Sequence, residues 1–316
     1  MSNLLEINNV VKRYGDYTAL NNVSLQIPKG SVFGLLGPNG AGKTTTLRML
    51  TGYLPPTSGT ATIAGYDIFK DSIKARSQIG YMPENVPLYD DMRVREYLKF
   101  RGHIKGLRGS EARRLTAEAI ETCGLAHMRK RMIKTLSKGY RQRVGLSQAL
   151  IHDPKVLILD EPTDGLDPNQ KHQVRELIRN LSADKTVIVS THILEEVSAV
   201  CTRAMILAKG EIVFDGTPSE LAAKSDFHNA VTIRLGKFSE VVVGALKKIP
   251  NVLEVSVDHD SVITVFSRDG ESILAEVNQV LQRGGCLLDE LHVEVGRLDD
   301  VFRKVTMATT QTPVSE

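Results

Sequence analysis

The chain has 316 residues, which favours two domains, and its net charge of +3, with basic and acidic residues interleaved, argues against a nucleic-acid partner. Its three cysteines, Cys123, Cys201 and Cys286, lie far apart without metal-ligand spacing, which indicates small core residues in a reducing compartment. Because no stretch approaches the ~20 apolar residues that span a bilayer and no signal sequence is present, we expect a soluble, cytoplasmic chain.

The N-terminal region has the pattern of short strands. From Leu4 to about Gly30, runs of β-forming residues are broken by Asn, Gly and Pro, and similar turn chemistry returns in the segment PPTSGTATIAG. These runs predict strands and hairpins, an antiparallel β subdomain that flanks the loop described next.

A glycine-rich loop, GPNGAGKTTT from Gly37 to Thr46, lies between a strand pattern and a helix pattern. Its glycines let backbone N–H groups turn inward, and the N-terminus of the following helix adds free N–H groups and a positive dipole end. The G-x-x-x-x-G-K-[ST] pattern therefore predicts a phosphate site, in which Lys43 reaches the outer phosphates and the Thr44 hydroxyl ligates Mg²⁺. The alternative is an ordinary glycine turn. The predicted phosphate-contacting residues are Gly37, Pro38, Asn39, Gly40, Ala41, Gly42, Lys43, Thr44 and Thr45.

The region from about 87 to 151 changes to helical spacing and predicts a helical insertion. Within it, LSKGYRQRVGLSQAL predicts a helix with Ser137 at its N-cap. The Ser137 hydroxyl, the Gly139 backbone and the helix dipole then form a second anion site. A plain N-cap without a ligand is the alternative.

Two adjacent carboxylates, Asp160 and Glu161, follow the apolar run VLIL, which is typical of a strand buried in a parallel sheet. Strand ends line the nucleotide site in such sheets, so we expect Asp160 to hold Mg²⁺ and Glu161 to act as general base on the attacking water. A solvated acidic turn is the alternative. A predicted crossover helix and a further strand complete a βαβ unit, and His192 follows that strand, where an imidazole can contact a γ-phosphate.

The character of the chain shifts again near 221–229, which we interpret as a linker. The following segment, 230–306, alternates apolar and polar residues in strands and has two helical faces, which predicts the β-α-β-β-α-β order of a small ferredoxin-like α+β domain. A short helix with Leu298, Val301, Phe302 and Val305 ends it, and the polar tail 307–316 is predicted to be disordered. The main domain then spans 1–220.

Together, these motifs resemble the nucleotide-binding subunit of ATP-binding cassette (ABC) transporters, over Leu4 to about Pro218. The resemblance implies an α/β P-loop NTPase of ABC type that binds ATP and Mg²⁺ and hydrolyses ATP, with His192 as the switch histidine. It further implies that Tyr14, in KRYG, stacks on adenine and that Asp167, in GLDP, belongs to the nucleotide-binding D-loop. Glu84 falls at the Q-loop position, whose side chain reaches the Mg²⁺ ion.

This chain departs from the family pattern at three residues. The signature usually reads LSGGQ, whereas Lys138 and Tyr140 replace its first glycine and its glutamine, and Glu84 stands where the family has glutamine. Ser137 and Gly139, the phosphate-contacting pair, are retained, so we expect nucleotide capture to survive. The effect of the three substitutions on coupling is left open.

The resemblance implies a peripheral ATPase on the cytoplasmic face of the membrane that forms a homodimer around ATP and drives a separately encoded permease. The signature forms and the ending RLDDVFRKVT resemble the export branch, which includes drug, polysaccharide and gliding-associated systems. An importer ATPase is the nearest alternative. A ribosome-acting ABC protein carries two cassettes and a DNA-repair ATPase a long heptad-rich insertion, features that this sequence lacks. These motifs do not identify the transported substrate.

Overall fold

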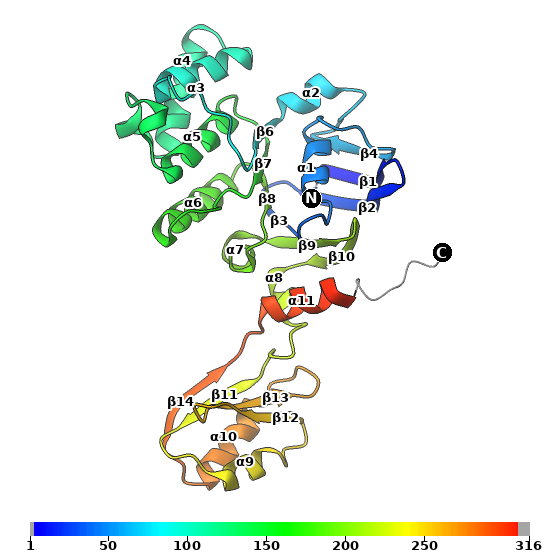
Figure 1. Ribbon diagram of the computed structural model, residues 1–316, viewed down its shortest axis with the longest axis vertical. Helices are drawn as coiled ribbons and strands as arrows, with labels where there is room; N and C mark the ends of the chain where they lie inside the picture. Colours follow the sequence, from blue (N-terminus) through cyan, green and yellow to red (C-terminus); the bar gives the residue numbers. More distant parts are fainter. Residues whose placement is uncertain (1–2, 309–316) are drawn as a thin grey trace. The chain divides into compact units, whose positions relative to one another are not determined.

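The computed structural model describes residues 3–308, and the chain divides into two compact units, Met1–Gly216 and Thr217–Glu316 (Figure 1). The boundary lies before the short helix α8 (Pro218–Ala222), so the segment 221–229 that we interpreted as a linker belongs to the second unit. The part of the predicted tail from 309 onward lies outside the described residues.

The centre of the first unit is a six-stranded sheet in the order β10-β9-β3-β8-β7-β6. Neighbouring strands from β9 to β6 are parallel, and β10 is antiparallel to β9. All five residues of β3, β7 and β8 are buried, as the continuous apolar runs predicted. The strands are β3 (Val32–Leu36), β6 (Ile79–Met82), β7 (Val156–Asp160), β8 (Thr186–Ser190), β9 (Arg203–Ala208) and β10 (Glu211–Gly216).

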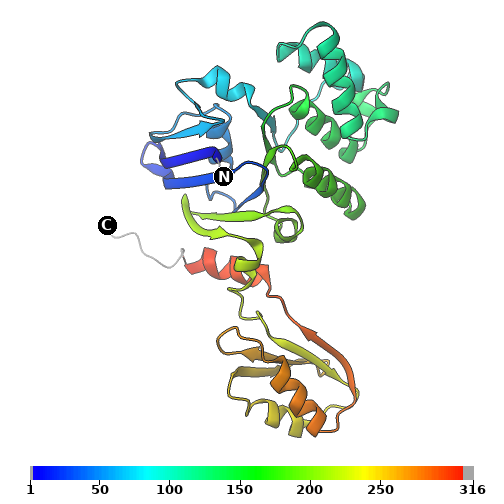
Figure 2. The ribbon, with the colours of Figure 1, turned by 180° about the vertical axis from the view of Figure 1, so that it is seen from behind.

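A second, antiparallel sheet in the order β2-β1-β4-β5 forms the predicted β subdomain. Helix α1 (Lys43–Leu50) lies beside it in both views (Figures 1 and 2). Leu47 of α1 shares one hydrophobic core with Leu5 of this sheet and Ile158 of the central sheet, which joins the two sheets around the loop before α1. The strands are β1 (Asn3–Tyr14), β2 (Tyr17–Pro28), β4 (Ser58–Ile63) and β5 (Tyr66–Asp67).

The helical insertion packs against the other side of the central sheet. A second core joins Tyr97 and Leu98 of α3 and Val144 of α5 to Leu157 and Leu159 of β7. Helix α6 is the crossover helix between the parallel strands β7 and β8 that the βαβ pattern predicted. The helices of this unit are α2 (Ser72–Ser77), α3 (Val94–Ile104), α4 (Gly109–Thr122), η1 (Ala126–Met128), η2 (Ile133–Thr135), α5 (Lys138–Leu150), α6 (Pro168–Leu181) and α7 (Leu194–Val200).

The second unit contains a four-stranded antiparallel sheet in the order β12-β13-β11-β14, with α9 and α10 packed on one face. Its element order, β-α-β-β-α-β, is that of the predicted ferredoxin-like fold. In the two central strands, β11 and β13, alternate residues are buried in the core that the two helices cover. The elements are β11 (Val231–Leu235), α9 (Glu240–Leu246), β12 (Val252–Val257), β13 (Ile263–Ser267), α10 (Leu274–Arg283), β14 (Leu288–Val293) and α11 (Leu298–Ala308).

The final helix, α11, packs against α8, and Val301 is its buried anchor. Across residues 3–308, no helix combines the length and the apolar character needed to cross a membrane. Cys123 is buried and Cys201 and Cys286 are half-buried, and all three are free thiols.

Candidate nucleotide site

The loop between β3 and α1 has a backbone that only glycines allow. Gly37, Gly40 and Gly42 have φ angles of 155°, 80° and 108°. A Cβ at Gly37 would lie 2.4 Å from the carbonyl oxygen of Leu207, and one at Gly42 would lie 2.8 Å from that of Ala19. The loop backbone therefore packs closely against β9 at Gly37 and against β2 at Gly42, whereas, apart from its chain neighbours, no atom lies within 4 Å of a Cβ added at Gly40.

This loop lines a hollow of about 270 Å³, together with two tyrosines from the paired ends of β1 and β2. Pro38 through Thr45, which are predicted to contact phosphate, line it, and Gly37 is not among the lining residues. Tyr14 is 46% exposed and lies at the hollow, where a ring can stack on a base. Sequence reasoning missed Tyr17, which pairs with Tyr14 across the hairpin and whose hydroxyl lies 3.5 Å from the Gly40 carbonyl oxygen. The two-residue turn between the tyrosines was the available signal.

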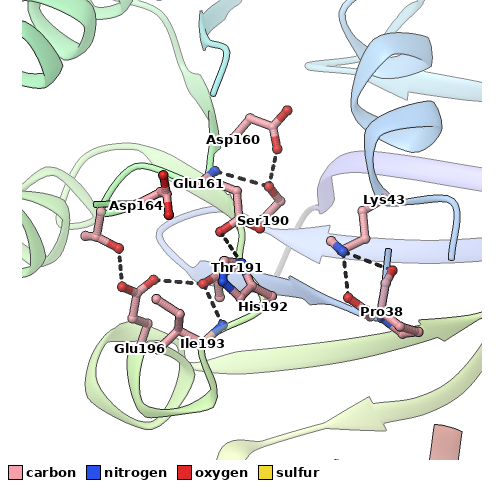
Figure 3. Close-up of polar contacts among 12 residues, drawn as sticks. Pro38, Lys43, Asp160, Glu161, Asp164, Ser190, Thr191, His192, Ile193 and Glu196 are labelled. Carbon is pink, nitrogen blue, oxygen red and sulfur yellow. Dashed lines mark hydrogen bonds and ion pairs between the residues drawn. The ribbon is translucent and has the colours of Figure 1, made fainter. Parts of the chain in front are cut away.

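Lys43 connects this loop to the carboxylates. Its Nζ donates hydrogen bonds to the carbonyl oxygens of Gly37 at 2.6 Å and Pro38 at 3.2 Å (Figure 3). Burial lowers the pKa of Lys43, while the charges of Glu161 and Asp160 oppose that shift. The charges at the end of β7 therefore act on the lysine of the loop, an arrangement in which the strand ends face the loop.

The two adjacent carboxylates have different surroundings. Asp160 is 6% exposed and accepts a hydrogen bond from the Ser190 hydroxyl at the end of β8. Glu161 has a φ of 48°, which is unusual for a residue with a side chain, and its backbone N–H donates to the Ser190 carbonyl oxygen at 3.1 Å. Its Oε2 lies 3.0 Å from Nδ1 of His192. Burial raises the pKa of Glu161, opposed by the hydrogen bond and charge of His192 and by the charge of Lys43.

A buried polar network joins the loops that carry Glu161 and His192, and sequence reasoning missed it. Glu196 of α7 is 4% exposed and accepts hydrogen bonds from the hydroxyls of Thr163 and Thr191 (Figure 3). The Thr191 hydroxyl also accepts one from the backbone N–H of residue 193 at 3.0 Å. No local pattern links these three side chains, so only the fold brings them together.

The second predicted anion site begins at the start of α5. Ser137 holds the predicted N-cap position with φ −64° and ψ 163°, and its side chain makes no cap hydrogen bond among the described residues. The hydroxyl is exposed instead. Gly139 is buried against the side chain of Gln170, and a Cβ at this position would lie only 2.4 Å from Oε1 of Gln170. Lys138 Nζ pairs with Asp164 at 3.2 Å.

Asp167 has a structural role in this chain, since its carboxylate accepts a hydrogen bond from the backbone N–H of Gln170 at 2.9 Å and caps α6. The described residues that line the hollow around Lys43 do not include Ser137, Gly139 or Asp167.

The comparisons with known proteins agree with this geometry. A family model described as "ABC transporter" matches residues 20–164. The linearmycin resistance ATP-binding protein LnrL of Bacillus subtilis is 33% identical over 97% of this chain and 99% of its own length. The chain belongs to the ABC transporter ATP-binding proteins.

Two further relatives extend the match. The Nod factor export ATP-binding protein I of Cupriavidus metallidurans is 39% identical over 70% of this chain and 73% of its own length. A solved ATP-binding cassette, a dimer in a post-hydrolysis state bound to ADP and Pi, is 26% identical, with a TM-score of 0.61 over 68% of this chain and 98% of its own. This ABC protein is accordingly an ATPase subunit of a transporter.

The residues at this site of the ABC protein fit a magnesium ion that is shared with the nucleotide. Across residues 3–308 there is no group of three or more His, Cys, Asp or Glu side chains that would hold a metal ion by itself. Mg²⁺ commonly takes one or two protein ligands and completes its shell with water and substrate phosphates. Asp160 and Thr44 offer oxygen ligands of this kind: Oδ1 of Asp160 accepts a hydrogen bond from the Ser190 hydroxyl, and Thr44 lines the hollow beside Lys43.

Glu84 lies elsewhere in the ABC protein. It lines a separate hollow of about 310 Å³ beside Lys138, Arg141 and Gln142. Tyr140, at the position of the usual signature glutamine, turns to His127, with 3.1 Å between its hydroxyl and Nε2. Two of the three departures from the family pattern, Glu84 and Lys138, therefore line the same hollow.

Proposed function

We propose that two copies of this ATPase subunit close around ATP and drive a separately encoded permease at the cytoplasmic face of a membrane, with export as the direction. The relatives support this proposal: one is named for Nod factor export and another for linearmycin resistance. The solved cassette that is dimeric with ADP and Pi supports the dimer. Importer subunits share the catalytic motifs, so the direction depends on these relatives.

The chemistry follows from Glu161 and Lys43. The loop amides and Lys43 bind the outer phosphates, and Tyr14 stacks on adenine. Thr44 and Asp160 would hold Mg²⁺, which would neutralise phosphate charge. Glu161 accepts a proton from water as the water oxygen bonds to the γ-phosphorus and the bond between that phosphorus and the bridging oxygen breaks. The contact of Glu161 with His192, 3.0 Å apart, carries this assignment because it fixes the direction of the base.

The proposed dimer supplies groups that one chain does not bring to its own ATP. Ser137 has an exposed hydroxyl without a capping role, at the N-terminus of the 13-residue helix α5. Free backbone N–H groups and the positive dipole end favour an anion there. Ser137 and Gly139 of each copy would meet the phosphates held by Lys43 of the other, with Asp167 near the same contact.

A cationic groove supports a docking site for the permease. Arg76, Arg101 and Lys105 line a hollow of about 220 Å³, and the described residues of its wall include no Asp or Glu. Burial lowers the pKa of Lys105, and the charges of Arg101 and Arg76 lower it further. We infer that an acidic segment of the permease binds here. Tyr81 lines the same groove, and burial together with the charge of Asp160 raises its pKa to about 12.

A mixing experiment tests the composite site. Lys43→Ala and Ser137→Arg each damage both sites of their own homodimer. In a mixed dimer the two lesions fall in the same site, and the other site is intact. Random exchange makes about half of the dimers mixed, so about a quarter of the original sites return if the sites act independently.

The measurement is ATP-dependent capture in a single turnover, beside steady-state hydrolysis, since coupling between sites can suppress the latter. Subunit exchange is verified with two different affinity tags. A gain on mixing supports the sandwich. If neither assay gains when exchange is verified, the site is not shared between copies and the dimer proposal fails.

A further inference from the structure

A second cationic hollow, of about 220 Å³, lies in the groove between α3 and α4, two helices that run beside each other (Figure 1). It is separate from the ATP site and from the groove around Lys105, with which it shares no lining residue. Four basic side chains line it: Arg95, Lys99, Arg113 and Arg129. Among the described lining residues, Glu121 is the one acid.

These four side chains come from three segments that the backbone holds together. Arg95 and Lys99 are one turn apart on α3, and Arg113 is on α4. Arg129 follows η1, and its carbonyl oxygen accepts a hydrogen bond from the backbone N–H of Arg95 at 3.0 Å. Within residues 3–308, none of the four has an ion pair or a side-chain hydrogen bond, whereas the neighbouring Arg114 pairs with Glu118 at 3.0 Å.

The base of the hollow carries an unpartnered polar group. Thr116 of α4 is 4% exposed, and its hydroxyl is buried without a hydrogen-bond partner in the described part of the chain. A helical threonine commonly bonds the carbonyl of the preceding turn, and buried hydroxyls nearly always have a partner. Four cations with one acid, around a hydroxyl without a partner, indicate a ligand with several acceptor oxygens.

We propose that this hollow binds a phosphate group. Guanidinium forks match phosphate oxygens, and three arginines, a lysine and a hydroxyl exceed what the two oxygens of a carboxylate accept. Ala117 and Ile120 complete the wall and offer an apolar surface to a group attached to the phosphate. A soluble phosphate compound and a phospholipid headgroup share this chemistry, and the experiment separates them.

The first arm follows inorganic phosphate by amide NMR of the full chain loaded with Mg-ADP, so that the ATP site is filled. We expect saturable shifts at Thr116 and Arg129. Arg113→Gln should weaken binding about tenfold, and Thr116→Val about threefold, whereas Thr116→Ser retains it. Arg114→Gln is the matched control, because it removes the same charge from the same helix outside the hollow, and we expect less than a twofold change.

The second arm measures flotation of the same variants with phosphatidylcholine vesicles, with and without phosphatidylglycerol. A phosphate response that Arg113→Gln weakens and Arg114→Gln does not supports the site with a soluble source. The same difference in flotation, without a response to phosphate, supports a headgroup. Equal effects of the two arginine variants in both arms, or no binding in either arm, overturns the proposal. The arginine variants change exposed side chains, so the test stands even where Thr116→Val fails to fold.

Discussion

Glu196→Ala should destabilise the first unit by about 3–6 kcal/mol, because it leaves two buried hydroxyls without their acceptor. Thr163 and Thr191 are 2% and 0% exposed, so water does not replace the carboxylate. Hydrogen bonds to a charged group contribute about 1.5–3 kcal/mol each, and two are lost. The Arg175 guanidinium, 3.9 Å from Glu196 and 20% exposed, adds little. Glu196→Gln keeps the shape and one acceptor oxygen, so it should cost about 1–3 kcal/mol.

The assay is denaturant unfolding of the full chain, with Glu195→Ala as the control. Glu195 lies in the same first turn of α7 but is exposed, so its loss should cost less than about 1 kcal/mol. Since the network joins the loops of Glu161 and His192, Glu196→Gln should also lower kcat while leaving the Kd for ATP unchanged. A Glu196→Ala cost below about 1 kcal/mol, or one equal to that of Glu195→Ala, would refute the reasoning.

Three other outcomes are expected. Glu161→Gln should bind ATP as the native chain does but lose about 10²–10⁴-fold in turnover, measured by phosphate release, and native turnover would contradict its role as base. Burial first, and then the charge of Lys105, lower the pKa of His152 from 6.5 to about 4, so the folded state resists its protonation. Stability should therefore fall as pH drops from 6.5 towards 4, and His152→Gln should flatten that slope in denaturation curves; an unchanged slope would contradict this assignment. Residues 217–308 alone should unfold cooperatively, and a random-coil circular dichroism spectrum would show that they need the first unit.

The parts that the sequence predicted well are those whose physics is local. An uninterrupted apolar run such as VLIL in β7 has no polar face to turn to solvent, so it belongs in the middle of a parallel sheet. The loop before α1 needs glycines in fixed places, and its phosphate chemistry lies in one contiguous segment. The strands of the second unit alternate with period two, which also predicted their ferredoxin-like order.

Other features depend on contacts between distant segments. Ser137 satisfies the local rule for an N-cap, yet the start of α5 is held by packing of Gly139 on Gln170 and by the ion pair of Lys138 with Asp164. The position of Glu84 depends on how the helical insertion meets β6, which no pattern in its own segment records. Such contacts become visible only when the chain is folded.

Glu161 shows how the local rules give way at the site. Its φ of 48° lies in the left-handed region, where glycine is favoured and other residues cost about 1–3 kcal/mol. Glycine would relieve that strain but would remove the carboxylate beside His192. The surrounding structure over-determines the conformation, since the backbone N–H of Glu161 is bonded to the Ser190 carbonyl and its side chain to His192. A strained residue that keeps its side chain at the end of a buried strand, held beside His192, is what the proposed role of Glu161 as a positioned general base requires.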